Sequence, residues 1–191
     1  MPASTLAINC LAGSFCTQFG WDSSYTHMEC KVCSPCSQGT YQPTTNQATQ
    51  CLSCPAGTYS NAVGSSSCTN CPVGKYSGAT GWPECVSCTE GKYTNTAGST
   101  ACISCLAGQS SIPPAGPGSC FLCAAGKFSA AGSVCVSCPA GRYSSVAGST
   151  TCWACSAGTY SPASSSSCTS CPINTFSSYA GSSSCTACNP G

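Results

Sequence analysis

The hydrophobic positions along this chain show no 3.6-residue period, and Gly or Pro interrupts every segment long enough to be a candidate helix. What recurs instead is an aromatic residue between Thr or Lys and Ser, as in Thr58-Tyr59-Ser60 and Lys75-Tyr76-Ser77. Such triplets, bounded by turn residues, favour short strands. We therefore predict almost no helix, and short β-strand pairs joined by turns.

The triplets belong to a longer repeat, which is clearest in residues 54–71. It reads C-P-x-G-x-aromatic-S, then a polar run, then G-S-x-x-C, and two residues later the next copy opens with another cysteine. Nine full copies follow one another at a period of about 17 residues. Such a series predicts an elongated solenoid or rod of small disulfide-rich modules, each touching only its neighbours. We assign an irregular cysteine-containing N-terminal cap to 1–35, nine tandem repeats to 36–187 and the start of a truncated tenth repeat to 188–191.

Each repeat position has an expected structural role. The glycine three residues after the opening cysteine predicts a turn with positive φ, and Asn174 takes that place in the ninth copy. The aromatic ring is interpreted as a local mini-core that covers a disulfide and leans on the next module. The fifth copy departs from the pattern, because Ser110 replaces the aromatic residue and Pro113-Pro114 and Pro117 lie in its loop. We expect a bend or hinge there.

Composition explains how such a chain can fold without a conventional core. It has 23 cysteines in 191 residues, which is typical of a disulfide scaffold from an oxidising, extracellular compartment. Charged residues make up 5% of the sequence and the net charge is +1. The chain therefore has no strong electrostatic field that would attract nucleic acid or anionic lipid. The sequence predicts no membrane span. The N-terminus lacks the features of a signal peptide, and we expect the chain to be a fragment or processed form.

Two disulfide schemes fit the period: one closes each module, and the other links adjacent C-x-x-C pairs in a ladder. We favour the first, because a closed loop of about 13–15 residues is small enough to be a module and contributes roughly 3 kcal/mol. The cap cysteines at 10, 16, 30 and 33 allow three pairings. The number of cysteines is odd, so Cys188 is expected to bond either a cysteine beyond Gly191 or another subunit. The favoured scheme pairs Cys36 with Cys51, Cys54 with Cys68, Cys71 with Cys85, Cys88 with Cys102, Cys105 with Cys120, Cys123 with Cys135, Cys138 with Cys152, Cys155 with Cys168 and Cys171 with Cys185.

Metal binding and catalysis are the competing chemistries. The C-x2-C spacing matches zinc ribbons, but several tetrathiolate sites would need more than the five Lys and Arg residues to balance their charge. His27 is the only imidazole, and the four carboxylates of Asp22, Glu29, Glu84 and Glu90 are scattered along the sequence. We predict no catalytic site, no cofactor and no metal.

The repeat resembles the ephrin-receptor-like cysteine-rich repeat, which is related to the small loop modules of tumour-necrosis-factor-receptor cysteine-rich domains. Cys54, Pro55, Gly57, Tyr59 and Cys68 carry the resemblance in its clearest copy, and residues 36–188 match it throughout. Long arrays of this repeat are also similar to protist cysteine-rich surface proteins. The resemblance implies one disulfide per module and an elongated extracellular scaffold, and it implies no binding site.

These observations predict a non-catalytic extracellular structural protein, a disulfide-stapled rod that builds a filament, surface coat or appendage. Its expected partners are further copies of itself, joined head to tail, or other surface and matrix proteins, with O-glycans on serine runs such as 164–167 and 182–184. The alternative is the ectodomain of a receptor or adhesin that binds a protein or glycan. For that reading, one repeat position predicts a sparse basic stripe made of Lys75, Lys92, Lys127 and Arg142.

Overall fold

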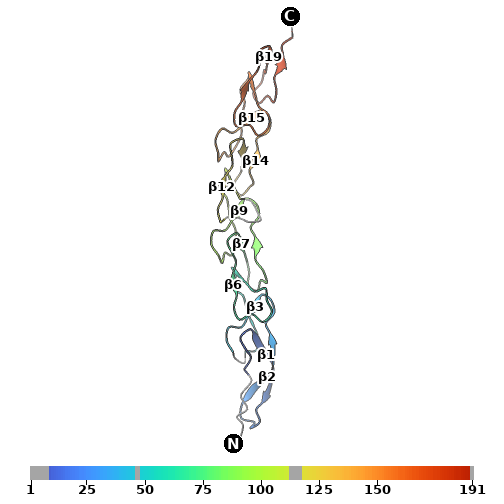
Figure 1. The fold of residues 1–191 in the computed structure, drawn as a ribbon, viewed down its shortest axis with the longest axis vertical. Helices are drawn as coiled ribbons and strands as arrows, with labels where there is room; N and C mark the ends of the chain where they lie inside the picture. Colours follow the sequence, from blue (N-terminus) through green and yellow to red (C-terminus); the bar gives the residue numbers. More distant parts are fainter. Residues whose placement is uncertain (1–8, 46–47, 112–117, 190–191) are drawn as a thin grey trace. The chain divides into compact units, whose positions relative to one another are not determined.

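The computed structural model describes residues 9–45, 48–111 and 118–189. Within these residues the chain forms short antiparallel strand pairs and no helix (Figure 1). This confirms the predicted fold class of small disulfide-rich repeats with short strands and turns. The predicted hinge around Pro113-Pro114 lies outside the described residues.

The chain divides into two compact units. Unit 1 comprises Met1–Ser87 and Thr96–Cys102, and unit 2 comprises Cys88–Asn95 and Ile103–Gly191. Both units are built from the same module, and each is described by itself below.

Unit 1 opens with a hairpin of two eight-residue strands, β1 (Ser14–Trp21) and β2 (Met28–Pro35), drawn in blue in Figure 1. Their register shifts at Gln18, where β1 contains an irregularity. The remaining strands have two residues each and pair in sequence order. They are β3 (Thr40–Tyr41) with β4 (Leu52–Ser53), β5 (Thr58–Tyr59) with β6 (Thr69–Asn70), and β7 (Lys75–Tyr76) with β8 (Val86–Ser87).

Unit 2 repeats these two-residue pairs. In each pair the residue at the aromatic position lies opposite the first residue after the closing cysteine, as Tyr143 lies opposite Trp153. The pairs are β9 (Lys92–Tyr93) with β10 (Ile103–Ser104), β11 (Gln109–Ser110) with β12 (Phe121–Leu122), β13 (Lys127–Phe128) with β14 (Val136–Ser137), β15 (Arg142–Tyr143) with β16 (Trp153–Ala154), β17 (Thr159–Tyr160) with β18 (Thr169–Ser170), and β19 (Thr175–Phe176) with β20 (Thr186–Ala187).

A tight turn precedes the first strand of each module. In the module 54–68 the Thr58 N–H donates to the Pro55 carbonyl at 3.0 Å, and Gly57, the third residue of the turn, has φ of 85°. A residue with a Cβ is disfavoured at such a φ. The prediction of positive φ is confirmed at all eight glycines of this position and at Asn174, whose φ is 63°.

Successive modules are joined by main-chain hydrogen bonds. The Gly57 N–H donates to the Ser77 carbonyl at 2.9 Å, and the Cys71 N–H returns a bond to the Gly57 carbonyl at 2.9 Å. A third bond runs from the Gly81 N–H to the Cys54 carbonyl at 2.8 Å. The same three bonds recur between the modules 138–152 and 155–168. The two-residue strands are therefore the smaller part of the main-chain network.

Modules also meet the module after next. A Cβ on Gly57 would collide with the carbonyl group of Gly98, and a Cβ on Gly141 would collide with that of Gly181. Each pair joins a module to the second one along the chain. The prediction that each module touches only its nearest neighbours is therefore wrong. The reason is that glycine lets two main chains approach at a distance that any side chain would prevent.

The interior consists of sulfur and small polar side chains. The opening cysteines from Cys36 to Cys155 are buried, and so is the Ser or Thr that follows the aromatic position. Most of these hydroxyls bond the preceding module, as when Ser77 Oγ donates to the Thr58 carbonyl at 3.0 Å, whereas Ser60 Oγ bonds Ser65 Oγ in its own module. The rings at the aromatic position are half-buried, except that Phe176 is 44% exposed, and Tyr59 and Tyr93 each share a hollow with residues of the next module.

Candidate functional surfaces

Disulfide bonds close the modules. Cys88 and Cys102, the opening and closing cysteines of the fourth module, are both disulfide-bonded. A loop of about 15 residues contributes roughly 3 kcal/mol by restricting the unfolded chain, so a series of them stabilises a chain that buries little apolar surface. The described bonds join Cys36 to Cys51, Cys54 to Cys68, Cys71 to Cys85, Cys105 to Cys120, Cys123 to Cys135, Cys138 to Cys152, Cys155 to Cys168 and Cys171 to Cys185.

In the N-terminal segment the structure selects one of the three pairings that the sequence left open. Cys10 bonds Cys33, and Cys16 bonds Cys30. The first of these two bonds corresponds to the bond that closes a module. Gly13, three residues after Cys10, has φ of 85° and donates its N–H to the next module at 2.8 Å. The segment therefore begins as a module and carries a longer hairpin with a second disulfide. The spacing C-x-x-G-x-F in residues 10–15 was the available sequence signal.

The sulfur atoms of Cys10, Cys30 and Cys33 gather within 4.8 Å of one another. All three cysteines are in disulfides, so none of them is a thiolate ligand in this structure. The cluster arises because the two disulfides of the hairpin pack together, with Cys10 Sγ 3.4 Å from Cys30 Sγ.

The turn at the end of the β1–β2 hairpin is organised around Asp22. Its carboxylate accepts hydrogen bonds from Ser24 Oγ and from the Thr26 N–H, both at 2.8 Å. The Ser24 bond is the largest influence on the pKa of Asp22, and together these bonds hold that pKa well below its usual range against a smaller, opposing effect of desolvation. His27 Nδ1 lies 3.7 Å from Asp22 Oδ2 on the exposed side of the turn. These polar groups stabilise the turn, and Asp22 also lines an open hollow of about 550 Å³ together with Glu29 and Lys31.

Tyr25 lies within this turn and points into solvent. It has φ of 58°, which is uncommon for a non-glycine residue, and it is 79% exposed. Trp21 and Met28, which face each other across the hairpin, are also exposed. We call Trp21, Tyr25 and Met28 the hairpin tip. Sequence reasoning missed it, because no repeat pattern marks these residues.

Cys188 carries a free, exposed thiol. Its N–H donates to the Asn174 carbonyl at 2.8 Å, as the N–H of Cys171 donates to the Gly158 carbonyl at 2.9 Å. The residue therefore follows the module pattern in its main chain, while its sulfur remains accessible.

The basic residues of the predicted stripe occupy equivalent strand positions with different surroundings. In unit 1, Lys75 shares a shallow hollow with Glu84. In unit 2, Lys127 lines a groove with Glu90, and Arg142 Nη1 donates to the Cys152 carbonyl at 3.2 Å. Lys92 lies on β9 and is exposed. Two of the four cations therefore have an acidic neighbour, which reduces the positive potential that a stripe would need.

A groove with apolar walls lies where the fifth module meets the sixth, and sequence reasoning did not predict it. It has a volume of about 380 Å³. Phe121, Leu122 and Val134 supply apolar walls, with Glu90 and Lys127 at its polar edge. Ser110 lines it at the repeat position that an aromatic residue fills in the other modules. We call this hollow the Ser110 groove.

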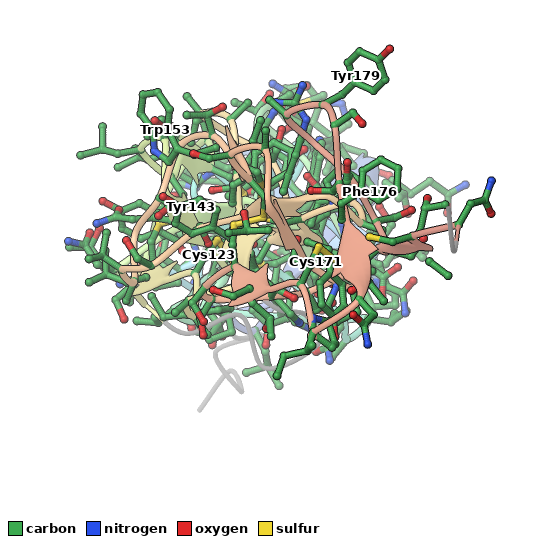
Figure 2. All side chains as sticks on the ribbon, turned by 90° about the horizontal axis from the view of Figure 1, so that it is seen from above. Cys123, Tyr143, Trp153, Cys171, Phe176 and Tyr179 are labelled. Carbon is green, nitrogen blue, oxygen red and sulfur yellow. A yellow bond between two sulfur atoms is a disulfide. The ribbon has the colours of Figure 1, made fainter. Side chains whose placement is uncertain are left out.

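Further apolar side chains project from the last modules of unit 2. Figure 2 shows Trp153 and Tyr179 pointing outward, whereas Cys123 and Cys171 lie among the ribbons. Tyr179 is 80% exposed. Such single exposed rings are common on protein surfaces and do not by themselves define a site.

Taken together, the closed loops, the buried cysteines and the module-to-module hydrogen bonds define a disulfide-rich tandem-repeat domain of an extracellular type. A comparison with known families agrees. The family described as "Tyrosine-protein kinase ephrin type A/B receptor-like" matches residues 45–81, 74–116, 126–159 and 158–191, which is well over half of the chain. The chain belongs to this ephrin-receptor-like family of cysteine-rich repeats. No curated protein matches it in sequence.

Among the residues that the structure describes, no helix has the length and apolar character needed to cross a membrane.

Proposed function

We propose that this chain is a non-catalytic extracellular structural protein, whose modules form a rod that builds a filament, a surface coat or an appendage. The observation that carries the proposal is the repeated main-chain bonding between modules, exemplified by Gly57, Ser77 and Cys71. These bonds use the most regular positions of the repeat to join one module to the next. Filament subunits need such stiffness, and arrays of repeats provide it with few residue types.

The surface of the chain supports this role. Serine runs in the last two modules contain exposed residues, such as Ser166, Ser167, Ser183 and Ser184. With only 5% charged residues, hydroxyl groups and O-glycans on them supply the hydration that keeps an extracellular array soluble.

In this proposal assembly proceeds head to tail, and a disulfide from the exposed Cys188 thiol makes it covalent. The test is gel electrophoresis of the native oxidised protein with and without reductant, beside a Cys188→Ser variant. The proposal expects high-mass species that reductant and C188S both reduce in size. A monomer in every lane, with Cys188 bonded to residues beyond Gly191, would favour the second function below.

That second function is the ectodomain of a receptor or adhesin that binds a protein or glycan, and the receptor named in the family description favours it. The basic stripe of Lys75, Lys92, Lys127 and Arg142 would contact an acidic partner. Changing all four residues to Ser and measuring retention on a sulfated glycan column tests this reading. Unchanged retention would remove the stripe from consideration, whereas earlier elution would support it.

A further inference from the structure

An open hollow at the hairpin tip is a part of unit 1 that the repeat does not explain. It has a volume of about 550 Å³ and is lined by Trp21, Asp22, Ser23, Tyr25, Glu29 and Lys31. These residues come from the end of β1, the turn and the start of β2. The later modules of unit 1 are closed with two-residue strands, so a module does not need a hairpin of this length. We call this space the tip hollow.

Two aromatic rings border the tip hollow and are exposed to solvent. Trp21 is 55% exposed and Tyr25 is 79% exposed. The backbone that carries them is fixed, because the Tyr25 N–H donates to the Asp22 carbonyl at 3.1 Å and the Asp22 N–H donates to the His27 carbonyl at 2.9 Å. Tyr25 also has a positive φ of 58°, a conformation that is enriched at functional sites. Binding a ligand would therefore order little additional backbone.

Charged groups of both signs lie in the same hollow. The side chain of Glu29 is only 8% exposed, and its carboxylate accepts a hydrogen bond from Lys31 Nζ at 3.2 Å. The Asp22 carboxylate is held by Ser24 and Thr26. The tip hollow therefore presents two fixed acceptor groups and one ammonium donor next to two rings. Sites that bind small molecules combine these features, since they have apolar walls and a few placed polar groups.

This combination selects the chemical class of the ligand. An anion would be repelled by Asp22 and Glu29, and a cation would meet the ammonium group of Lys31. A purely apolar ligand would remove water from these ions without replacing its hydrogen bonds. A neutral sugar ring fits all of them, because its hydroxyl groups donate to carboxylates and accept from an ammonium group. The C–H groups of the sugar ring pack against the negative face of an aromatic ring.

We propose that the tip hollow binds a neutral hexose unit of a glycan, whose ring packs on Trp21 and Tyr25 and whose hydroxyl groups bond Asp22, Glu29 and Lys31. The inference rests on the second function proposed above, that of a receptor or adhesin, and gives it a site and a ligand class. It involves neither the exposed thiol nor the basic stripe. Head-to-tail assembly and hexose binding can therefore be tested separately.

Binding of the full oxidised chain to immobilised oligomers of glucose, mannose and galactose tests the site. We expect the wild type to bind at least one of these neutral glycans. Trp21→Ala and Tyr25→Ala should each weaken that binding about tenfold or more, since each removes a ring that packs on the sugar. Glu29→Gln keeps the shape of the side chain and should also weaken binding, because a carboxylate is a stronger acceptor than an amide. Near-ultraviolet circular dichroism and mass spectrometry of the disulfides verify that each variant is folded.

Two residues of unit 2 supply matched controls. Trp153 is 65% exposed and Tyr179 is 80% exposed, close to the values for Trp21 and Tyr25, and neither of them lines the tip hollow. Trp153→Ala and Tyr179→Ala should leave hexose binding unchanged. Equal losses in these two controls would show that any exposed ring of the chain binds the sugar, and would overturn the site.

Charged probes complete the test, with a sulfated glycan as the anionic ligand and a trimethyllysine peptide as the cationic one. A wild-type chain that binds only one of these, or that binds none of the neutral oligomers, would overturn the proposal. If the sulfated glycan alone is retained, and its retention depends on the basic stripe, the second function stands without the tip hollow. A chain that binds hexose through the tip hollow but stays monomeric would support the site and overturn head-to-tail assembly instead.

Discussion

At the scale of single residues, glycine and serine hold the modules together, a role that large apolar side chains have in most proteins. Glycine permits the positive φ of each turn and the approach of a second main chain, while a buried hydroxyl bonds the preceding module. The periodic positions of these residues made the turns predictable from the sequence. The contact between Gly141 and Gly181 was not predictable, because it joins residues 40 positions apart that share no local pattern.

Two glycines of unit 2 separate the effect of the turn from that of the contact. Gly141 and Gly158 have φ of 80° and 82°, but a Cβ on Gly141 meets the Gly181 carbonyl, whereas a Cβ on Gly158 meets no atom within 4 Å. We expect Gly158→Ala to lower the free energy of unfolding by about 1–2 kcal/mol through backbone strain. Gly141→Ala should cost a further ~1–3 kcal/mol through overpacking. Thermal unfolding of the two variants measures the difference, and equal losses would contradict the contact.

The stability of the turn around Asp22, in the N-terminal hairpin, is expected to depend on pH. Because the folded pKa of Asp22 is depressed, its contribution is fully present above the unfolded pKa of about 3.9 and is lost as the pH falls through the folded pKa. Asp22→Asn should therefore loosen the turn at neutral pH, and the difference from wild type should shrink in strong acid. Amide hydrogen exchange at Thr26, measured in both proteins, follows this change. A difference that persists undiminished at low pH would contradict the role of the carboxylate.

At the scale of elements, the module is a closed loop with a turn, two short strands and a disulfide. The cysteine period alone predicted its length, and the interpretation that each loop closes on itself followed from its small size. The sequence did not predict that residues 10–33 enclose a module with an inserted hairpin. Cys16 and Cys30 obscured the pattern, since an extra disulfide within one loop breaks the regular spacing.

Removing one disulfide tests how far a module depends on its neighbours. The double variant Cys138→Ser and Cys152→Ser should destabilise that module by roughly 3 kcal/mol, because its 14-residue loop is no longer closed in the unfolded chain. The amides of Gly126 and Cys155, which donate to the Ser144 and Gly141 carbonyls of that module, should then exchange faster than in wild type. The amide of Gly39 in unit 1 serves as the control. Exchange that rises equally at all three sites would show that the chain unfolds as one cooperative unit.

At the scale of the whole molecule, most positions of the chain serve the repeat structure, and few side chains are available for binding or for chemistry. Its family membership and disulfides fit an extracellular domain, and the surfaces left over are the hairpin tip, the Ser110 groove and the Cys188 thiol. The sequence indicated Cys188 because the number of cysteines is odd. The tip and the groove emerged only from the structure, because both depend on which side chains the modules leave uncovered.

Electron microscopy of the oxidised wild-type chain, applied at increasing protein concentration, tests the central claim most directly. The account predicts linear assemblies that lengthen with concentration and that are shorter in reductant and in the Cys188→Ser variant. Dispersed single molecules of constant size at every concentration would contradict it.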